Sequence, residues 1–268
     1  LINVSNLTFS YEGSYDNIFE NISFQIDTDW KLGFIGRNGR GKTTFLNLLL
    51  GKYAYSGNIS STVKFEYFPY DVEDKSLYTI EVMKSICTEC MDWEIFREIS
   101  LLDVQEDALY RPFNTLSNGE QTKVLLAALF LTASCFLLID EPTNHLDLDA
   151  RNVVQNYLKR KKGFILVSHD RSLLDQCVDH ILSINKTNIE IQKGNFTSWW
   201  ENKTLQDNFE LAENKKLLKE IGRLSYAAKR SSNWSNKVEK SKYGTTNSGS
   251  KLDKGYVGHK AAKAMKRA

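Results

Sequence analysis

Residues 36–43 form a glycine-rich segment that can hold phosphate groups. They run Gly-Arg-Asn-Gly-Arg-Gly-Lys-Thr and satisfy the pattern G-x-x-x-x-G-K-[ST]. Its three glycines are expected to adopt backbone conformations closed to other residues, so that successive N–H groups point at an anion. Lys42 would reach the β/γ-phosphates and Thr43 would offer its hydroxyl to Mg²⁺. The segment predicts a nucleoside triphosphate site formed by Gly36, Asn38, Gly39, Arg40, Gly41, Lys42, Thr43 and Thr44.

Two adjacent carboxylates, Asp140 and Glu141, end the apolar run that begins at residue 135. A continuously apolar run is typical of a strand buried on both faces. Open α/β sheets bind ligands at the carboxyl ends of their strands, so we expect Asp140 to act on Mg²⁺ through outer-sphere contacts. Glu141 would serve as base or orienter for an attacking water. The alternative, an acidic strand end that faces solvent, is disfavoured by the phosphate-binding segment upstream.

Residues 116–121, Leu-Ser-Asn-Gly-Glu-Gln, stand directly before the amphipathic run 122–129. They resemble the signature sequence of ATP-binding-cassette (ABC) ATPases, which usually has Gly where this chain has Asn118. The resemblance implies that the signature acts in trans, with Ser117 and Gly119 capping the γ-phosphate bound by another cassette. The residues assigned to this role are Ser117, Asn118, Gly119 and Glu120.

Three further positions take roles that the same resemblance implies. His169, in the run Leu-Val-Ser-His-Asp-Arg, matches the family's switch histidine, which bridges the γ-phosphate and the region of Glu141. Tyr11 stands where cassettes carry an aromatic residue that stacks on adenine, although an aromatic in a strand-like run can equally serve packing. Position 70, after Tyr67-Phe68-Pro69, is a tyrosine where the family places a glutamine that senses Mg²⁺ and water. Either a neighbour such as Asp71 substitutes for the glutamine or hydrolysis in this site is altered, so the departure concerns turnover rather than nucleotide binding.

Residues 141–147, Glu-Pro-Thr-Asn-His-Leu-Asp, are similar to a run of the ABC-F subfamily, soluble proteins with two cassettes in one chain that act on ribosomes. Within ABC-F the chain resembles the antibiotic-resistance branch of the Lsa/Vga type, through residues 30–44, 111–113 and 194–196. The resemblance implies ATP and Mg²⁺ as cofactors, a second cassette or a homodimer as partner for hydrolysis, and a cytoplasmic protein. It also implies ribosomal protection against lincosamides, streptogramin A and pleuromutilins.

The pattern of elements agrees with an α/β fold, a P-loop NTPase of the ABC cassette type. We expect a mixed sheet with helices on both faces, an antiparallel β subdomain and a small helical subdomain at about 76–132, all within residues 1–195. Residues 93, 95, 96, 99 and 102 would supply the core of the helical part. The expected antiparallel strands are 2–10 and 21–27, the central parallel strands 32–36, 135–140 and 163–168, the helices 42–50, 119–132 and 147–161, and the closing strands 180–184 and 188–192.

Residues 196–268 are predicted to be a basic helical linker, truncated at its end. The stretch 196–232 lacks proline and would form one helix of roughly 55 Å. Its apolar stripes require a partner helix. Residues 244–258 suggest a loop and 259–268 the start of a returning helix. The ABC-F resemblance implies a second linker helix and a second cassette, so we expect this chain to be the N-terminal half of a longer protein. The stripes comprise Leu205, Phe209 and Ala212, then Leu217, Ile221, Leu224 and Ala228.

The net charge of +2 hides an asymmetry along the chain. Residues 201–268 hold 16 Lys or Arg against 7 Asp or Glu, a net of +9, whereas residues 1–200 hold 19 against 26, a net of −7. A basic tail is either a solvated helical face or a surface for an anionic polymer such as ribosomal RNA. No run approaches the roughly 18 apolar residues that cross a bilayer. Cys87 and Cys90 form a lone C-x-x-C, which favours reduced thiols over a zinc site.

Two other functions fit parts of this pattern. A single cassette suits the ATPase subunit of a membrane transporter, although the basic helical tail does not. Tyr70 and the single phosphate segment also suit a catalytically idle nucleotide-binding half-protein.

Overall fold

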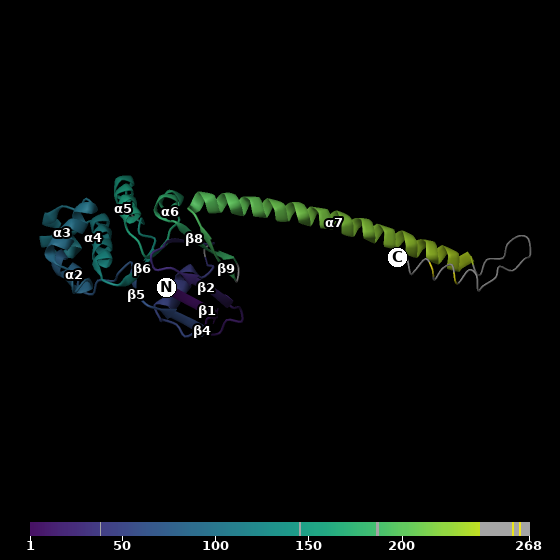
Figure 1. The fold of residues 1–268 in the computed structure, drawn as a ribbon, viewed down its shortest axis with the longest axis horizontal. Coiled ribbons are helices and arrows are strands. Elements are labelled where there is room, and N and C mark those ends of the chain that lie inside the picture. Colours follow the sequence, from purple (N-terminus) through teal and green to yellow (C-terminus); the bar gives the residue numbers. More distant parts are fainter. Residues whose placement is uncertain (38, 145, 186–187, 242–258, 260–262, 264–268) are drawn as a thin grey trace, which may run out of the picture. The chain divides into compact units, whose positions relative to one another are not determined.

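The computed structural model describes residues 1–37, 39–144, 146–185 and 188–241, together with residues 259 and 263. The chain divides into two compact units, Leu1–Glu201 and Asn202–Ala268. The first unit contains the strands and the shorter helices of the described chain, and the second contains most of the long helix α7 (Phe196–Ser241) (Figure 1).

A six-stranded sheet forms the centre of the first unit, with the strand order β5-β6-β7-β3-β8-β9. Five of the strands are parallel and the edge strand β9 runs antiparallel to β8. The central parallel strands and the two closing strands expected from the sequence are therefore confirmed. The strands are β3 (Lys31–Ile35), β5 (Lys64–Phe68), β6 (Cys135–Asp140), β7 (Phe164–Val167), β8 (His180–Asn185) and β9 (Asn188–Lys193).

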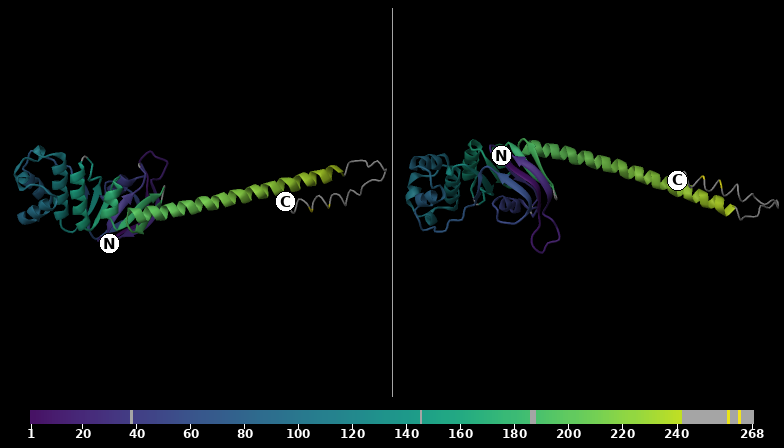
Figure 2. Two further views of the ribbon diagram at one scale, coloured as in Figure 1. Left: turned by 90° about the horizontal axis from the view of Figure 1, so that it is seen from above. Right: turned by 60° about the horizontal axis from the view of Figure 1, so that its bottom comes forward.

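A second, antiparallel sheet has the order β2-β1-β4, as the alternating N-terminal runs predicted for its first two strands. Its strands are β1 (Ile2–Phe9), β2 (Phe19–Ile26) and β4 (Ser56–Ser61). In Figure 1 and in both views of Figure 2 this sheet lies on one side of the first unit, and the helices α2, α3 and α4 lie together on the other.

The helices of the first unit follow the strands along the chain. The three that the sequence predicted are α1 (Lys42–Leu49), α4 (Asn118–Leu131) and α5 (Leu148–Arg160). The remaining ones are α2 (Thr79–Ile86), α3 (Asp92–Leu101), α6 (Arg171–Cys177) and the short 3-10 segments Glu106–Tyr110 and Phe113–Thr115. The helices α4, α5 and α6 begin with side-chain caps, in which Ser117, Asp147 and Asp170 respectively accept backbone hydrogen bonds.

The apolar core forms two clusters, one on each face of the six-stranded sheet. On β6, Phe136 and Leu138 pack with α1 and the antiparallel sheet, whereas Leu137 and Ile139 pack with the α2–α4 helices. Successive residues of a strand point to opposite faces, so a strand covered on both sides must be apolar at every position. We call these the α1-side cluster and the helix-side cluster.

The prediction that Trp93 belongs to the core of the helical subdomain is wrong. Ile95, Ile99 and Leu102 are fully buried, but Trp93 is 57% exposed. Residues 95, 99 and 102 follow the spacing of one helix face, and residue 93 falls outside it. Trp93 instead lies on the surface, where the guanidinium carbon of Arg97 stands 5.3 Å from the centre of the Trp93 ring.

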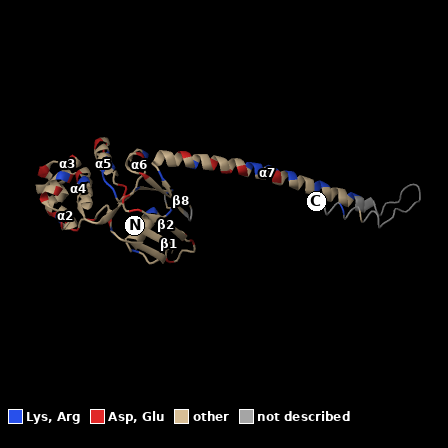
Figure 3. Cartoon of the chain, viewed as in Figure 1, with Lys and Arg blue, Asp and Glu red and all other residues tan. Residues whose placement is uncertain are grey.

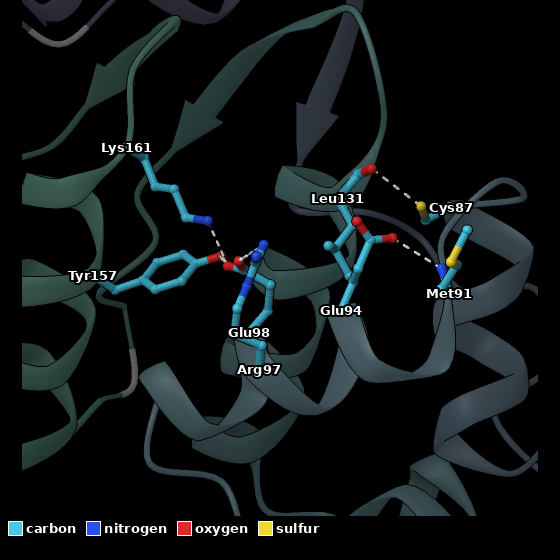
Figure 4. Close-up of polar contacts among 8 residues, drawn as sticks. All are labelled: Cys87, Met91, Glu94, Arg97, Glu98, Leu131, Tyr157 and Lys161. Atoms are coloured by element: carbon cyan, nitrogen blue, oxygen red, sulfur yellow. Dashed lines mark hydrogen bonds and ion pairs between the residues drawn. The ribbon is translucent and has the colours of Figure 1, made fainter.

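A buried carboxylate joins α3 to the end of α5. Glu98 is 1% exposed and accepts hydrogen bonds from the hydroxyl of Tyr157, at 2.6 Å, and from the Lys161 ammonium (Figure 4). Arg97 contacts its other oxygen at 3.1 Å. Burial opposes ionisation, but the bonds from Lys161 and Tyr157 outweigh it, so the pKa of Glu98 lies below its ordinary value of 4.5.

The helix α7 continues beyond the predicted end at residue 232 to Ser241. Most of the described apolar side chains of its second-unit part are exposed, among them Leu205, Phe209 and Ile221, each above 60%. The predicted loop and returning helix lie outside the described residues, except for two helical positions, 259 and 263. Figure 3 shows acidic residues in the first part of α7 and basic ones further along.

Across the described residues, every helix is too short or too polar to span a bilayer.

Replacement of Glu98 by Gln is expected to lower the free energy of unfolding by about 2–3 kcal/mol, because Lys161 loses a buried partner. Urea denaturation at pH 7 measures this change. Since the pKa of Glu98 is depressed in the folded state, the ionised carboxylate stabilises the protein above about pH 4.5, and this stabilisation is lost as the pH falls further. The free energies of unfolding of the two proteins should therefore converge in acid.

The control is Arg97→Ala. Because the Arg97 side chain is 54% exposed, this replacement should lower the free energy of unfolding by less than about 1 kcal/mol. Equal losses for both variants would contradict the assignment of the buried bonds to stability.

Candidate nucleotide-binding site

Three neighbouring parallel strands end at the same level and open onto one site. In the ladders of β7, Val167 pairs with Phe34 of β3 on one side and with Asp140 of β6 on the other. The segments that follow the three strands therefore start at one edge of the sheet, where α/β folds bind ligands. They carry the phosphate-binding segment, the two carboxylates and His169.

Two glycines of the phosphate-binding segment require their residue type. Gly39 has a φ of +75° and Gly41 has a φ of +94°, a region that other residues rarely adopt. A Cβ atom on Gly41 would also approach Ile18 Cγ2 to 2.6 Å. Gly36, in contrast, does not occupy this region, which corrects the expectation for all three glycines. Asn38 lies outside the described residues.

The start of α1 supplies the cationic side of the site. Gly41 is its N-cap, so the backbone N–H groups of the first turn are available to an anion. Lys42 donates to the carbonyl oxygen of Gly36 at 2.7 Å, which holds the ammonium over the segment. Burial lowers the pKa of Lys42, while the charges of Asp140 and Glu141 partly restore it.

Thr43 and Asp140, the two residues predicted to act on Mg²⁺, lie in contact. The Thr43 hydroxyl donates to Asp140 Oδ2 at 3.2 Å. Mg²⁺ prefers oxygen donors and commonly uses one or two carboxylates together with substrate phosphates, so this donor set fits the ion. Within the part of the chain that the structure describes, no group of three or more His, Cys, Asp or Glu side chains can hold a metal alone.

Glu141 adopts a strained backbone conformation at the end of β6. Its φ is +51°, which costs a residue with a side chain roughly 1–3 kcal/mol, and its N–H donates to the carbonyl of Val167 at 2.9 Å. The side-chain oxygen Oε1 is buried without a hydrogen bond and lies 3.6 Å from His169 Nε2. Burial raises the pKa of Glu141, with a further contribution from Asp140, and His169 and Lys42 partly oppose it.

Tyr11 lies at the rim of the site. Its hydroxyl shares a hydrogen bond of 2.7 Å with Thr44 Oγ1, and its ring packs edge-on against Phe9 and Tyr53. The side chain is nevertheless 42% exposed. Tyr11 thus has packing contacts and an accessible surface, and adenine stacking at this residue stays a prediction.

These groups surround one pocket of about 470 Å³. Arg40 and Gly36 are not among the described residues that line it. Ile18 and Val167 do line it and were not predicted, since isolated aliphatic residues give no sequence signal for a site. The lining residues are Tyr11, Ile18, Gly39, Gly41, Lys42, Thr43, Thr44, Asp140, Glu141, Val167 and His169.

The four signature residues begin α4 and do not line this pocket in the described structure. The Ser117 N–H donates to Glu120 Oε2 at 2.8 Å, and the Glu120 N–H donates back to Ser117 Oγ at 3.3 Å. This reciprocal pair is a capping box that fixes the start of the helix. The hydrogen bonds from Ser117 lower the pKa of Glu120.

Sequence reasoning assigned no role to Tyr67, whose hydroxyl donates to Asp140 Oδ2 at 3.2 Å. The available signal was its place on the strand that ends shortly before Tyr70. Tyr70 itself packs against the helix-side cluster and does not line the pocket in the described structure.

Comparison with known proteins agrees with this geometry. The sequence model of the family described as ABC transporter matches residues 19–144. The ribosome protection protein VmlR of Bacillus subtilis (strain 168) is 31% identical over 71% of this chain and 35% of its own length. The erythromycin resistance ATP-binding protein MsrA of Staphylococcus epidermidis is 34% identical over 67% of this chain and 34% of its own. ABC transporter F family member 3 of Arabidopsis thaliana is 30% identical over 73% of this chain and 28% of its own.

The fold also matches solved cassettes. The dimeric structure of a bacterial ABC transporter cassette has a TM-score of 0.61 at 17% identity, and covers 72% of this chain and 98% of that one. A dimeric post-hydrolysis cassette bound to ADP and Pi gives a TM-score of 0.60 at the same identity and coverage. The chain spans about a third of the length of the three relatives described above. It contains an ATP-binding cassette of the ABC transporter type and has homologues among the F family of these proteins.

Proposed function

We propose that this chain binds and hydrolyses ATP as part of an ABC-F protein that acts on the ribosome and protects it from antibiotics. The observation that carries the ATPase part is the meeting of Lys42, Thr43, Asp140, Glu141 and His169 at one pocket. These residues lie at or just after the ends of β6 and β7, or at the start of α1, which follows β3. Each has a chemistry that phosphoryl transfer needs.

Each side chain has a role in this proposal. Lys42 and the first turn of α1 bind the phosphates, and Thr43 with Asp140 hold Mg²⁺, which neutralises charge on the phosphates when bound. Glu141 accepts a proton from, or orients, the attacking water. Its raised pKa, caused by burial, brings it closer to that of an effective base near neutral pH. His169, next to Glu141, contacts the γ-phosphate.

Hydrolysis is proposed to need a second cassette. Ser117 and its neighbours start α4, away from the pocket lining, so they serve the nucleotide of a facing cassette. A second copy of this chain or a second cassette of a longer protein would supply the missing signature.

The ribosome is proposed as partner for two reasons: the names of two relatives and the basic charge of α7. VmlR is named a ribosome protection protein and MsrA an erythromycin resistance protein. On α7, residues 214–237 hold seven Lys or Arg and one Glu. Such a basic helix suits phosphate contacts of ribosomal RNA. Protection against lincosamides, streptogramin A and pleuromutilins follows from the Lsa/Vga resemblance and is part of the proposal.

A transporter ATPase subunit is the second candidate, favoured by the family description that residues 19–144 match. Co-purification with a membrane permease, and with no ribosomal fraction, would favour it over the ribosome.

Lys42→Ala is expected to weaken ATP binding by about 100-fold, because the variant cannot form a charge-assisted hydrogen bond to phosphate. Isothermal titration with Mg·ATP measures the change. The matched control is Lys31→Ala at the opposite end of β3, where the ammonium contacts the carbonyl of Lys159. Similar affinities for the two variants would refute the role of Lys42.

Glu141→Gln is expected to keep ATP binding and to slow phosphate release by at least about 100-fold, since the water loses its base. The trapped protein should also form ATP-dependent dimers in light scattering. Glu73→Gln, at an exposed position, is the control and should leave turnover unchanged. Ordinary turnover in Glu141→Gln would show that another group is the catalytic carboxylate.

The ATP-trapped Glu141→Gln protein is expected to co-sediment with ribosomes at low salt. Replacing Lys229, Arg230 and Lys237 by Ala should weaken this binding. The slope of log K against the logarithm of the salt concentration should become less steep by roughly 0.7–0.9 for each phosphate that is no longer neutralised. Sedimentation over a series of salt concentrations gives the slope.

The control variant neutralises three exposed lysines of the cassette, Lys64, Lys75 and Lys162. Absence of ribosome-bound protein at low salt, or equal slopes for both triple variants, would contradict the proposed role of α7.

A further inference from the structure

Tyr67 occupies a position on β5 from which its side chain reaches the end of β6. The two strands are parallel, and Tyr67 pairs with Leu138. Leu138 and Asp140 are two residues apart on one strand, so they point to the same face of the sheet. Tyr67 packs on that face, with the α1-side cluster. A tyrosine ring spans the remaining distance along the strand to Asp140.

The contact is specific in its atoms. The hydroxyl of Tyr67 and the hydroxyl of Thr43 both donate to Asp140 Oδ2, each at 3.2 Å. Two donors from different elements, β5 and α1, thereby hold one oxygen and set the orientation of the carboxylate. The Lys52 ammonium, 5.5 Å from the ring centre, adds a contact on the ring face.

Tyr70 lies on the other face of the sheet. It packs with the helix-side cluster, on which the α2–α4 helices lie, whereas Tyr67 packs with the α1-side cluster. The hydroxyl that β5 directs at the metal-site carboxylate therefore belongs to residue 67. The position where cassettes carry glutamine contributes to packing in this chain.

We infer that Tyr67 is a positioning residue for the magnesium side of the site. Its hydroxyl holds Asp140 Oδ2 in the orientation that Mg²⁺ binding requires, and it provides the polar link between β5 and the site that Tyr70 does not. This inference rests on the proposed ATP- and Mg²⁺-binding function.

The test compares Tyr67→Phe with Tyr70→Phe in the full chain, because each change removes one hydroxyl and keeps the ring. Binding of a non-hydrolysable ATP analogue is titrated against Mg²⁺, and also measured in EDTA without the metal. Loss of a positioning bond to a metal-binding carboxylate typically weakens metal affinity by about 10–100-fold. We expect Tyr67→Phe to raise the Mg²⁺ midpoint about tenfold with the EDTA affinity unchanged, and Tyr70→Phe to match the parent protein.

Several results would overturn the inference. One is a Mg²⁺ midpoint of Tyr67→Phe equal to that of the parent, and another is an equal shift in Tyr70→Phe. An equal loss of affinity with and without Mg²⁺ would show that Tyr67 only supports the fold. If the parent protein binds the analogue under neither condition, the proposed function falls together with the inference. If the parent binds with Mg²⁺ dependence and Tyr67→Phe is identical to it, the inference alone is wrong.

Discussion

The site depends on the register of the parallel ladders on both sides of β7. Because Val167 is level with both Phe34 and Asp140, three loops from distant parts of the sequence leave the sheet at one edge. A shift of two residues in either ladder would move one loop about 7 Å along the strand direction. The lysine, the two carboxylates and the histidine would then no longer share a pocket.

Residues at this edge of the sheet have unfavourable conformations and surroundings. Glu141 combines a left-handed backbone with a buried, unbonded oxygen, and Lys42 is partly desolvated beside it. Both features cost stability in the folded protein and both suit a site that receives a charged ligand. Among the other described residues, no buried side-chain nitrogen or oxygen lacks a hydrogen-bond partner. Glu98, although buried, has hydrogen-bond partners on both oxygens and joins α3 to α5.

The sequence predicted most of the strands and helices, because their periodicities are local properties. Its errors are also physical in origin. Trp93 was assigned to the core together with Ile95 and Ile99, whereas the helical phase of those two residues excludes it from the buried face. The helix α7 was ended too early, since residues 233–241 contain neither proline nor glycine to stop it. The apolar stripes of α7 were recognised, but the sequence pattern of one helix does not show which partner packs against those stripes.

For the site, residues close together in the sequence were enough to predict phosphate binding. Glycines, lysine and threonine at fixed spacing build a phosphate-binding turn from backbone geometry that is complete within residues 36–43. Tertiary structure alone decided which groups face that turn. Tyr67 and Asp140 are 73 residues apart and meet because β5 and β6 pair in one register, while Tyr70 is directed to the opposite face. Contacts across a sheet depend on strand pairing, which the residues of one strand do not encode.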